Sequence, residues 1–581
     1  MQLSISCSRS VRAGALIGNL VSLSPKPSDE EIDSSDPRHT TSLPGTILSV
    51  STQSLLVRAS RLFIAKRSGT LRQVTTTAVE PLAPPAQIPA DELLVAGEWR
   101  PGAGPEITCT DPATGCTITT LRGASASDVD AAARAAHAAA DAPAWRDLLP
   151  HRRARLLHRI ADGIDGAAEE LARLQTLDTG KTLAETRALA ASAAGTYRYL
   201  AAACETADGE LPTPRGEHLA MTVHEPVGVV AAITPWNSPI ASDAQKIAPA
   251  LAAGNAVLLK PAPWAPLVSL AAGRIVHRAL LDEGLPPALV SVLPGSGAEA
   301  GEALVRHDDV GIVSFTGGTA TGRRIAEIAG RRLIPVSLEL GGKSPAIICP
   351  DADLDHAVAG TLYGIFSSSG QSCVAGSRIF VPRDRHDELV ARLADATRRL
   401  RVGPGTDPRT QVGPLVHHDH RDRVAAMVDR AVAAGARVVT GGRIPDDPAL
   451  AGGAYYLPTV LDRVEPAWEI CREEVFGPVA VVLPYDDEDD LVRQADDTAY
   501  GLACGIWTAD HRRAWRIARR VRAGTVWVNT HKQFSISTPF GGVKDSGLGV
   551  EKGRLGLRTY STTKSVYWSL AEDPIPWAAP R

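Results

Sequence analysis

Three short apolar runs decide the fold: VGVVAAITP (residues 227–235), GNAVLLKPA (residues 254–262) and ALVSVLP (residues 288–294). Segments of helical character separate them. Strands of a parallel sheet have this composition, because helices cover both faces of the sheet and neither face needs polar side chains. The pattern predicts an α/β protein with a doubly wound region from about residue 89 to residue 338.

Outward from these runs, a second α/β region is expected over residues 339–540, followed by a short tail. Towards the N-terminus, Ser127 with Asp130 predicts a capped helix start. RARLLHRIADGIDGAAEELARLQTLDTG (residues 153–180) predicts one amphipathic helix that ends at a glycine, and residues 183–205 predict another. No internal repeat is visible.

Residues 1–88 differ from the rest, because they are rich in Ser, Thr and Pro and lack apolar periodicity. We expect a disordered extension or an upstream sequence read as protein. A targeting leader is the alternative, since the stretch from residue 37 to residue 79 contains no acidic residue. An acidic cluster at residues 29–36 argues against a transit peptide.

Composition excludes several classes of protein. The 581 residues carry 61 basic and 65 acidic side chains, a net charge of −4, which does not favour nucleic-acid binding. No apolar run is long enough to span a membrane. Eight cysteines without a CxxC pair predict neither a disulfide scaffold nor a metal site, and they favour a reducing, cytoplasmic location.

Polar residues follow two of the predicted strands, where open α/β sheets bind ligands. ITPWNSPI (residues 233–240) contains Trp236 and Asn237, and the Asn237 amide is suited to hold an oxyanion, although a plain turn is the commoner role. Lys260 ends the next strand, where it is placed either to bind ribose hydroxyls or to extend into water.

Two glycine-rich runs follow later strands. PGSGAEAG (residues 294–301), which contains Gly297, misses the G-x-G-x-x-G spacing by one residue. In FTGGTATG (residues 315–322), Gly317 and Gly318 lie between a strand and a helix, so that helix N-terminal amides could meet a pyrophosphate. A tight packing turn is the alternative.

The pair ELGGK (residues 339–343) and GQSC (residues 370–373) carries the reactive groups. Glu339 precedes Gly341, where the backbone can pass close to a ligand. Cys373 is a candidate nucleophile, although a lone cysteine is most often a small buried hydrophobe. No local His/Asp pair accompanies it, which argues against a papain-like triad.

Together these motifs resemble the aldehyde dehydrogenase superfamily, from about Leu93 to Lys564. The resemblance rests on their order and spacing: PWNSP, GNAVLLKPA, FTGGT, LELGGKSP, GQSC, EEVFGPV, YGLA, GTVWVN and PFGGVKDSGLG. It implies an NAD(P)-binding domain at 89–207 and 227–338, a catalytic domain at 339–540, an oligomerisation arm at 208–226 and 541–567, and a tail at 568–581.

The resemblance also implies roles for single residues. Cys373 would be the nucleophile, Glu339 the general base, and the Asn237 amide would hold the oxyanion with the Cys373 N–H. The cofactor would be bound by Trp236, Lys260, Gly297, Gly317, Gly318, Gly341, Glu474 and Phe476. The partners implied are a small aldehyde and further copies of the chain, as a homodimer or homotetramer.

Departures from the family pattern leave parts of this open. Ser238 replaces an aromatic residue, Gly318 a serine and Ser368 an asparagine. Pro263 stands where NAD-preferring members often have a glutamate that binds the ribose 2′-hydroxyl, which removes a repulsion against a 2′-phosphate without supplying a second cation. NAD is the expected cofactor, and NADP stays open. The alternatives to acid-forming oxidation are a CoA-acylating semialdehyde dehydrogenase and a cofactor-binding scaffold without catalysis.

Two loops carry weaker expectations. HKQFSIST (residues 531–538) should form the rim of the substrate funnel, with His531, Lys532 and Gln533 making that rim polar. HHDH (residues 417–420) is expected to be an exposed polar turn rather than a metal site.

Overall fold

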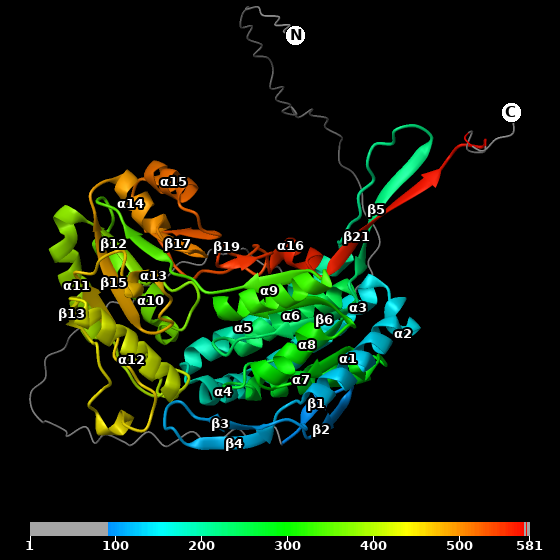
Figure 1. Cartoon of the computed structure of the whole chain (residues 1–581), viewed down its shortest axis with the longest axis horizontal. Helices are drawn as coiled ribbons and strands as arrows, with labels where there is room; N and C mark the ends of the chain where they lie inside the picture. Colours follow the sequence, from blue (N-terminus) through cyan, green and yellow to red (C-terminus); the bar gives the residue numbers. More distant parts are fainter. Residues whose placement is uncertain (1–90, 574–576, 578–581) are drawn as a thin grey trace, which may run out of the picture. The chain divides into compact units, whose positions relative to one another are not determined.

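The computed structural model describes residues 91–573 and residue 577, so the predictions for residues 1–88 lie outside the described part (Figure 1). The first sheet has eight strands in the order β2-β1-β8-β7-β6-β9-β10-β20. Their bounds are β1 Leu93–Val95, β2 Glu98–Arg100, β6 Val229–Ile233, β7 Ala256–Lys260, β8 Val290–Val292, β9 Val310–Thr316, β10 Val336–Glu339 and β20 Gly547–Leu548.

The three runs that predicted buried parallel strands form β6, β7 and β8, and this prediction is confirmed. Every residue of these strands is buried. The parallel strands are flanked by helices α1 (Ala126–Asp141), α6 (Pro239–Ala253), α7 (Leu267–Asp282) and α9 (Thr319–Arg332). This burial explains why the strands need no polar face.

The strand order places the ligand-binding edge of this sheet. From β6 the chain moves outward to β7 and β8, then returns to the other side of β6 with β9 and β10. The order therefore reverses next to β6, and ligands bind at the carboxyl ends of strands at such a reversal. Trp236 and Asn237 follow β6 there, and Gly317 and Gly318 follow β9.

The second sheet has seven strands in the order β13-β14-β15-β12-β11-β17-β18. Their bounds are β11 Pro345–Ile348, β12 Arg378–Pro382, β13 Arg437–Thr440, β14 Thr459–Asp462, β15 Val479–Tyr485, β17 Ala503–Trp507 and β18 Thr525–Val528. Successive residues along the strands enter two different apolar clusters, for example Ile347 and Phe380 in one, Ile348 and Ile379 in the other. Both faces are therefore covered, as in the first sheet.

Two of the three helix predictions needed adjustment. Helix α1 is capped by Ser125 with Asp128, not by Ser127 with Asp130, and both bonds of the capping box form at that earlier pair. The predicted helix over residues 153–180 is two helices, α3 (Pro150–Gly166) and α4 (Ala168–Thr179), which meet at Ala167. The bounds predicted for α5 (Leu183–Glu205) are confirmed.

A two-stranded ribbon consists of β5 (His218–Pro226) and β21 (Ser561–Ser569). They pair antiparallel along their whole length, from Ser561 opposite Pro226 to Ser569 opposite His218. The arm expected at residues 208–226 therefore takes its partner strand from the other end of the chain, and within the arm itself a single antiparallel bridge joins Glu210 and Thr222. None of the described helices has the length and apolar character needed to cross a membrane.

Candidate active site

Two loops meet where the chain passes from the first sheet to the second. Glu339 is the last residue of β10, and residues 340–344 lead from it into β11. Cys373 lies in the turn after α10 (Leu354–Phe366). The loops approach so closely that a Cβ on Gly342 would lie 2.2 Å from the Cys373 carbonyl oxygen. A side chain there would force the loops apart, so Gly342 is needed to bring Glu339 towards Cys373.

Asn237 joins the first sheet to the cysteine loop. Its side-chain Nδ2 donates a hydrogen bond to the Gln371 carbonyl oxygen at 3.0 Å. The Gln371 side chain is held in turn, because its Oε1 accepts from the Val416 amide at 2.8 Å. The amide group of Asn237 is therefore fixed two residues from Cys373, where it can donate to a developing oxyanion.

Glu339 is buried, with 3% of its surface exposed. Within the described residues neither of its carboxylate oxygens has a hydrogen-bond partner. Burial raises its pKa well above the ordinary value, Glu551 adds to the rise, and the ammonium groups of Lys246 and Lys552 oppose it. A buried carboxyl group without a partner is costly, which points to a reactant as its partner.

Cys373 is half-buried, and its surroundings raise the pKa of its thiol to about 12, chiefly through burial. The carboxyl groups of Glu474 and Glu339 contribute to this rise, whereas the ammonium groups of Lys532 and Lys552 oppose it. The surroundings therefore keep the resting sulfur protonated, and proton removal is part of any reaction at this thiol.

A cavity of about 270 Å³ opens beyond Trp236 at the carboxyl edge of the first sheet. Five residues proposed for cofactor binding line it: Trp236, Lys260, Gly297, Gly317 and Gly318. Gly318 is the N-cap of α9, and no atom lies within 4 Å of the Cβ position built there. The amide end of the helix is therefore open to a pyrophosphate, and the cavity fits one end of a dinucleotide.

Lys260 is buried, so it does not extend into water as a lysine at a strand end commonly does. Burial lowers its pKa to about 8, and its Nζ donates to the carbonyl oxygen of Pro261 at 3.2 Å. The cavity also contains Pro263 and Arg324. Arg324 is a second cation in this cavity that the sequence did not predict, and it is paired with Glu302 and Glu327.

The remaining proposed cofactor residues lie nearer to Cys373. Glu474 accepts a hydrogen bond from the Gly342 amide at 2.9 Å, and a Cβ on Gly341 would lie 2.5 Å from its other oxygen. Burial raises the Glu474 pKa to about 7. Phe476 packs edge-on against Trp236, with ring centroids 5.2 Å apart. Trp236 thus lies between the cavity and the segment that contains Glu474 and Phe476.

Sequence reasoning missed several residues of the site. Lys246 on α6 is fully buried and donates to Glu551 Oε1 at 2.5 Å. His420 is buried, contacts Trp236, and its Nε2 donates to the Phe476 carbonyl, so the predicted exposed turn at residues 417–420 is wrong for this residue. The signal for Lys246 was present, since it lies on the face of α6 that also carries the buried Asp243.

The expected polar rim is also wrong at His531, which is 2% exposed. Its ring stacks on Trp507, and its Nε2 donates to the carbonyl oxygen of Val374 at 2.9 Å. The lysine that follows, Lys532, is half-buried and donates to Ser367. The loop therefore turns inward at His531 and Lys532, whereas Gln533, Phe534 and Ser535 are exposed.

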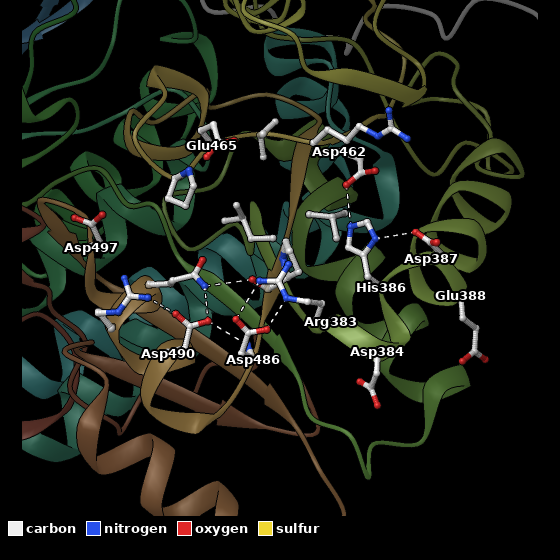
Figure 2. A pocket seen from close by; sticks show the side chains of 18 residues that line it. Arg383, Asp384, His386, Asp387, Glu388, Asp462, Glu465, Asp486, Asp490 and Asp497 are labelled. Atoms are coloured by element: carbon white, nitrogen blue, oxygen red, sulfur yellow. Dashed lines mark hydrogen bonds and ion pairs between the residues drawn. The ribbon is translucent and has the colours of Figure 1, made fainter.

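A larger cavity, about 660 Å³, lies at the second sheet, and none of the proposed site residues lines it (Figure 2). Its charged groups pair with one another: His386 contacts Asp462 at 2.9 Å, and Arg383 contacts Asp486 at 2.5 Å. Because none of the proposed catalytic or cofactor-binding residues lies there, we assign this cavity no role.

The fold and the site together define a class of two-sheet α/β proteins. In this class a cysteine and a buried glutamate lie near a cavity that is suited to bind a dinucleotide. Comparison with known proteins agrees. The model of the aldehyde dehydrogenase family matches residues 99–566. A putative aldehyde dehydrogenase, DhaS, from Bacillus subtilis is 41% identical over 484 residues, 83% of this chain and 96% of that protein. Phenylacetaldehyde dehydrogenase from Pseudomonas fluorescens is 40% identical over 82% of this chain and 95% of that protein.

Solved structures agree as well. The NAD+ complex of an aldehyde dehydrogenase from Bacillus cereus aligns with a TM-score of 0.80 at 36% identity, covering 83% of this chain and 96% of that one. Betaine aldehyde dehydrogenase from Staphylococcus aureus with NAD+ aligns with a TM-score of 0.82 at 34% identity, covering 84% and 97%. The chain belongs to the aldehyde dehydrogenase family.

Proposed function

We propose that the chain oxidises an aldehyde to the free carboxylic acid with NAD+, through a covalent intermediate on Cys373. The observation that carries this proposal is the approach of Cys373 to Glu339, a buried carboxyl group without a hydrogen-bond partner, across Gly342. The NAD+ complexes of related aldehyde dehydrogenases support the choice of cofactor.

The first half of the reaction uses Cys373 and Asn237. The thiolate attacks the aldehyde carbon, and the new oxyanion accepts hydrogen bonds from Asn237 Nδ2 and the Cys373 N–H. Loss of one such donor typically lowers the rate by about 10²–10³-fold. When bound, the oxidised nicotinamide supplies the two-electron acceptor that turns the thiohemiacetal into a thioester.

The second half uses Glu339. Its carboxylate takes a proton from water while the water oxygen attacks the acyl carbon, and the C–S bond breaks to release the carboxylic acid and the Cys373 thiolate. A water-activating base has little purpose if a CoA thiol receives the acyl group. Glu339 therefore favours the acid-forming reaction over the CoA-acylating one.

The cofactor would extend from the cavity, which would hold its adenosine end, to Cys373, where its nicotinamide would lie. Lys260 would bind the adenosine ribose, while Gly297, Gly317 and Gly318 would line the pyrophosphate. At the other end Glu474 would hold the nicotinamide ribose beside Gly341, and Phe476 with Trp236 would pack against the ring. Pro263 leaves room for a 2′-phosphate and places no carboxylate against it, so we expect NADP+ to be accepted as well.

We extend the proposal to the whole chain. The domain division is the one expected from sequence, with the β5–β21 ribbon as the oligomerisation arm of a dimer or a dimer of dimers. A two-stranded ribbon is rarely stable alone, and Tyr567 and Trp568 are largely exposed on it, which supports a partner there. We place the enzyme in the cytoplasm, since the seven described cysteines are all unpaired.

The test is reduction of NAD+ and NADP+ by a panel of aldehydes, with and without CoA. We expect reduced cofactor and free acid without CoA. A requirement for CoA would establish the acylating alternative. No reduction with any aldehyde would leave the chain as a cofactor-binding scaffold.

A further inference from the structure

Two lysines that the mechanism does not use approach Cys373 from different elements. Lys532 lies in the loop after β18. The residue before it, His531, donates a hydrogen bond to the Val374 carbonyl oxygen at 2.9 Å. The Lys532 backbone has φ +55°, and its Nζ donates to Ser367 Oγ at 2.9 Å and to the Ser367 carbonyl at 3.3 Å. The ammonium group is thereby held on the inner side of the loop, towards the cysteine turn.

The second lysine, Lys552, reaches the same region from the segment after β20. Its Nζ lies 4.3 Å from the ring centroid of Phe534 and 5.3 Å from that of Phe540. Phe540 and Cys373 pack against the same small apolar cluster, which includes Val374. Lys552 thus lies over aromatic rings that border the cysteine, with no hydrogen bond or ion pair to any described residue.

Neither lysine has a carboxylate of its own. Glu185 acts on both Lys532 and Lys181, and no described carboxylate forms an ion pair with Lys532. Glu551 is paired with Lys246, which leaves Lys552 without a dedicated carboxylate.

The carboxyl groups nearer the sulfur form no ion pair with these lysines either. Burial raises the pKa of both Glu339 and Glu474, which favours their neutral forms. Burial likewise lowers the pKa of Lys532 to about 7 and lowers that of Lys552, because neither half-buried amine has an ion-pair partner among the described residues. A carboxylate bound beside them would stabilise their charged forms.

We propose that Lys532 and Lys552 are specificity-determining residues that select an aldehyde bearing a carboxylate group. This inference rests on the proposed function, because it names the substrate class of the same site. The ammonium groups would pair with the carboxylate while the aldehyde carbon meets Cys373.

The same residues oppose a cationic aldehyde. Aromatic faces are the usual binding surface for a quaternary ammonium group, but here the faces of Phe534 and Phe540 already hold the ammonium of Lys552. A trimethylammonium substrate would also meet like charge at Lys532. Betaine aldehyde dehydrogenases are among the relatives of this chain. The two lysines would therefore give this chain a different substrate class from those relatives.

The first test reads the charge at Cys373 without cofactor or turnover. Alkylation by iodoacetate, an anion, is compared with alkylation by neutral iodoacetamide, and peptide mass spectrometry follows Cys373 and the exposed Cys116 in the same sample. The rate ratio of the two reagents does not depend on how much thiolate is present. We expect this ratio to be about 10-fold higher at Cys373 than at Cys116, because two cations attract the anion.

Matched variants assign that effect to the lysines. Lys532→Met and Lys552→Met should each lower the ratio at Cys373 several-fold, whereas Lys532→Arg and Lys552→Arg keep it. Lys544→Met, whose Nζ bonds to the Asp496 carbonyl away from Cys373, is the control and should leave it unchanged. An equal or lower ratio at Cys373 than at Cys116 in the parent protein would overturn the proposal.

The second test compares substrates of matched size: 4-oxobutanoate with pentanal, and trimethylammonioacetaldehyde with its neutral isostere 3,3-dimethylbutanal. We expect kcat/KM to favour the anion in the first pair and the neutral aldehyde in the second. Each Lys→Met change should lower the 4-oxobutanoate to pentanal ratio about 10-fold, mainly through KM. Oxidation of pentanal with no preference for 4-oxobutanoate would contradict the inference alone, and no oxidation of any aldehyde would contradict the proposed function.

Discussion

At the scale of single residues, Glu339 is buried where a charged carboxylate costs free energy. It has no hydrogen-bond partner among the described residues, and burial raises its pKa. The Cys373 thiol is likewise kept protonated by burial and by two nearby carboxyl groups. Each group can act only after losing a proton, so the resting site stores both reactive groups in their neutral forms.

Removing the base should separate the two halves of the reaction. Glu339→Gln keeps the size of the side chain but cannot take a proton from water. We expect one burst of reduced cofactor per site, followed by steady turnover lowered about 10²–10⁴-fold, because the thioester forms but is not hydrolysed. Rapid-mixing absorbance measures both phases. A variant without a burst would show that Glu339 is needed earlier, to deprotonate Cys373.

The raised pKa values also fix the direction of the pH dependence. Since the thiolate of Cys373 and the carboxylate of Glu339 are the reactive forms, rising pH increases the fraction of both. We expect kcat/KM for a neutral aldehyde to increase from about pH 6 to about pH 9. Steady-state rates across that range check this. A profile that falls with increasing pH would mean that a protonated group limits the reaction.

At the scale of elements, buried strands are the part of this protein that a sequence predicts best. β6, β7 and β8 must be apolar on both faces, so their residues alone identify them as buried strands. The helix break at Ala167 was harder to predict, because apolar residues continue at helical spacing across it.

The loop after β18 could not be predicted for a different reason. His531 and Lys532 are adjacent polar residues, and their inward orientation depends on the positive φ of Lys532 and on the stacking of His531 against Trp507. Both are tertiary features. The site residues with family motifs were predictable, whereas the positions of Lys552 and Arg324 depended on how distant elements pack.

The cofactor cavity at the ends of β6 and β7 gives a prediction about cofactor choice. Pro263 lines it beside Lys260 and Arg324. Pro263→Glu introduces a carboxylate that accepts a bond from a ribose 2′-hydroxyl and repels a 2′-phosphate. We expect the kcat/KM ratio of NADP+ to NAD+ to fall about 10-fold or more. Pro263→Gln, which adds size without charge, is the control, and an equal fall in both variants would contradict a charge effect.

At the scale of the whole molecule, the β5–β21 ribbon carries exposed aromatic side chains and is paired with no other described strand. Such an edge needs covering, and a closed symmetric assembly provides it. We expect a dimer or a tetramer by multi-angle light scattering at micromolar concentration. Trp568→Lys should weaken that assembly, while a parent protein that runs as a monomer would refute the role given to the ribbon.

The central claim is that Cys373 is the covalent partner of the aldehyde, and Cys373→Ala tests it most directly. Reduction of NAD+ by the best aldehyde of the panel is measured alongside NAD+ binding by calorimetry. We expect loss of detectable oxidation with cofactor binding kept within a few-fold, because no other described side chain is placed to form the thiohemiacetal. Oxidation within about 10-fold of the parent rate would contradict it.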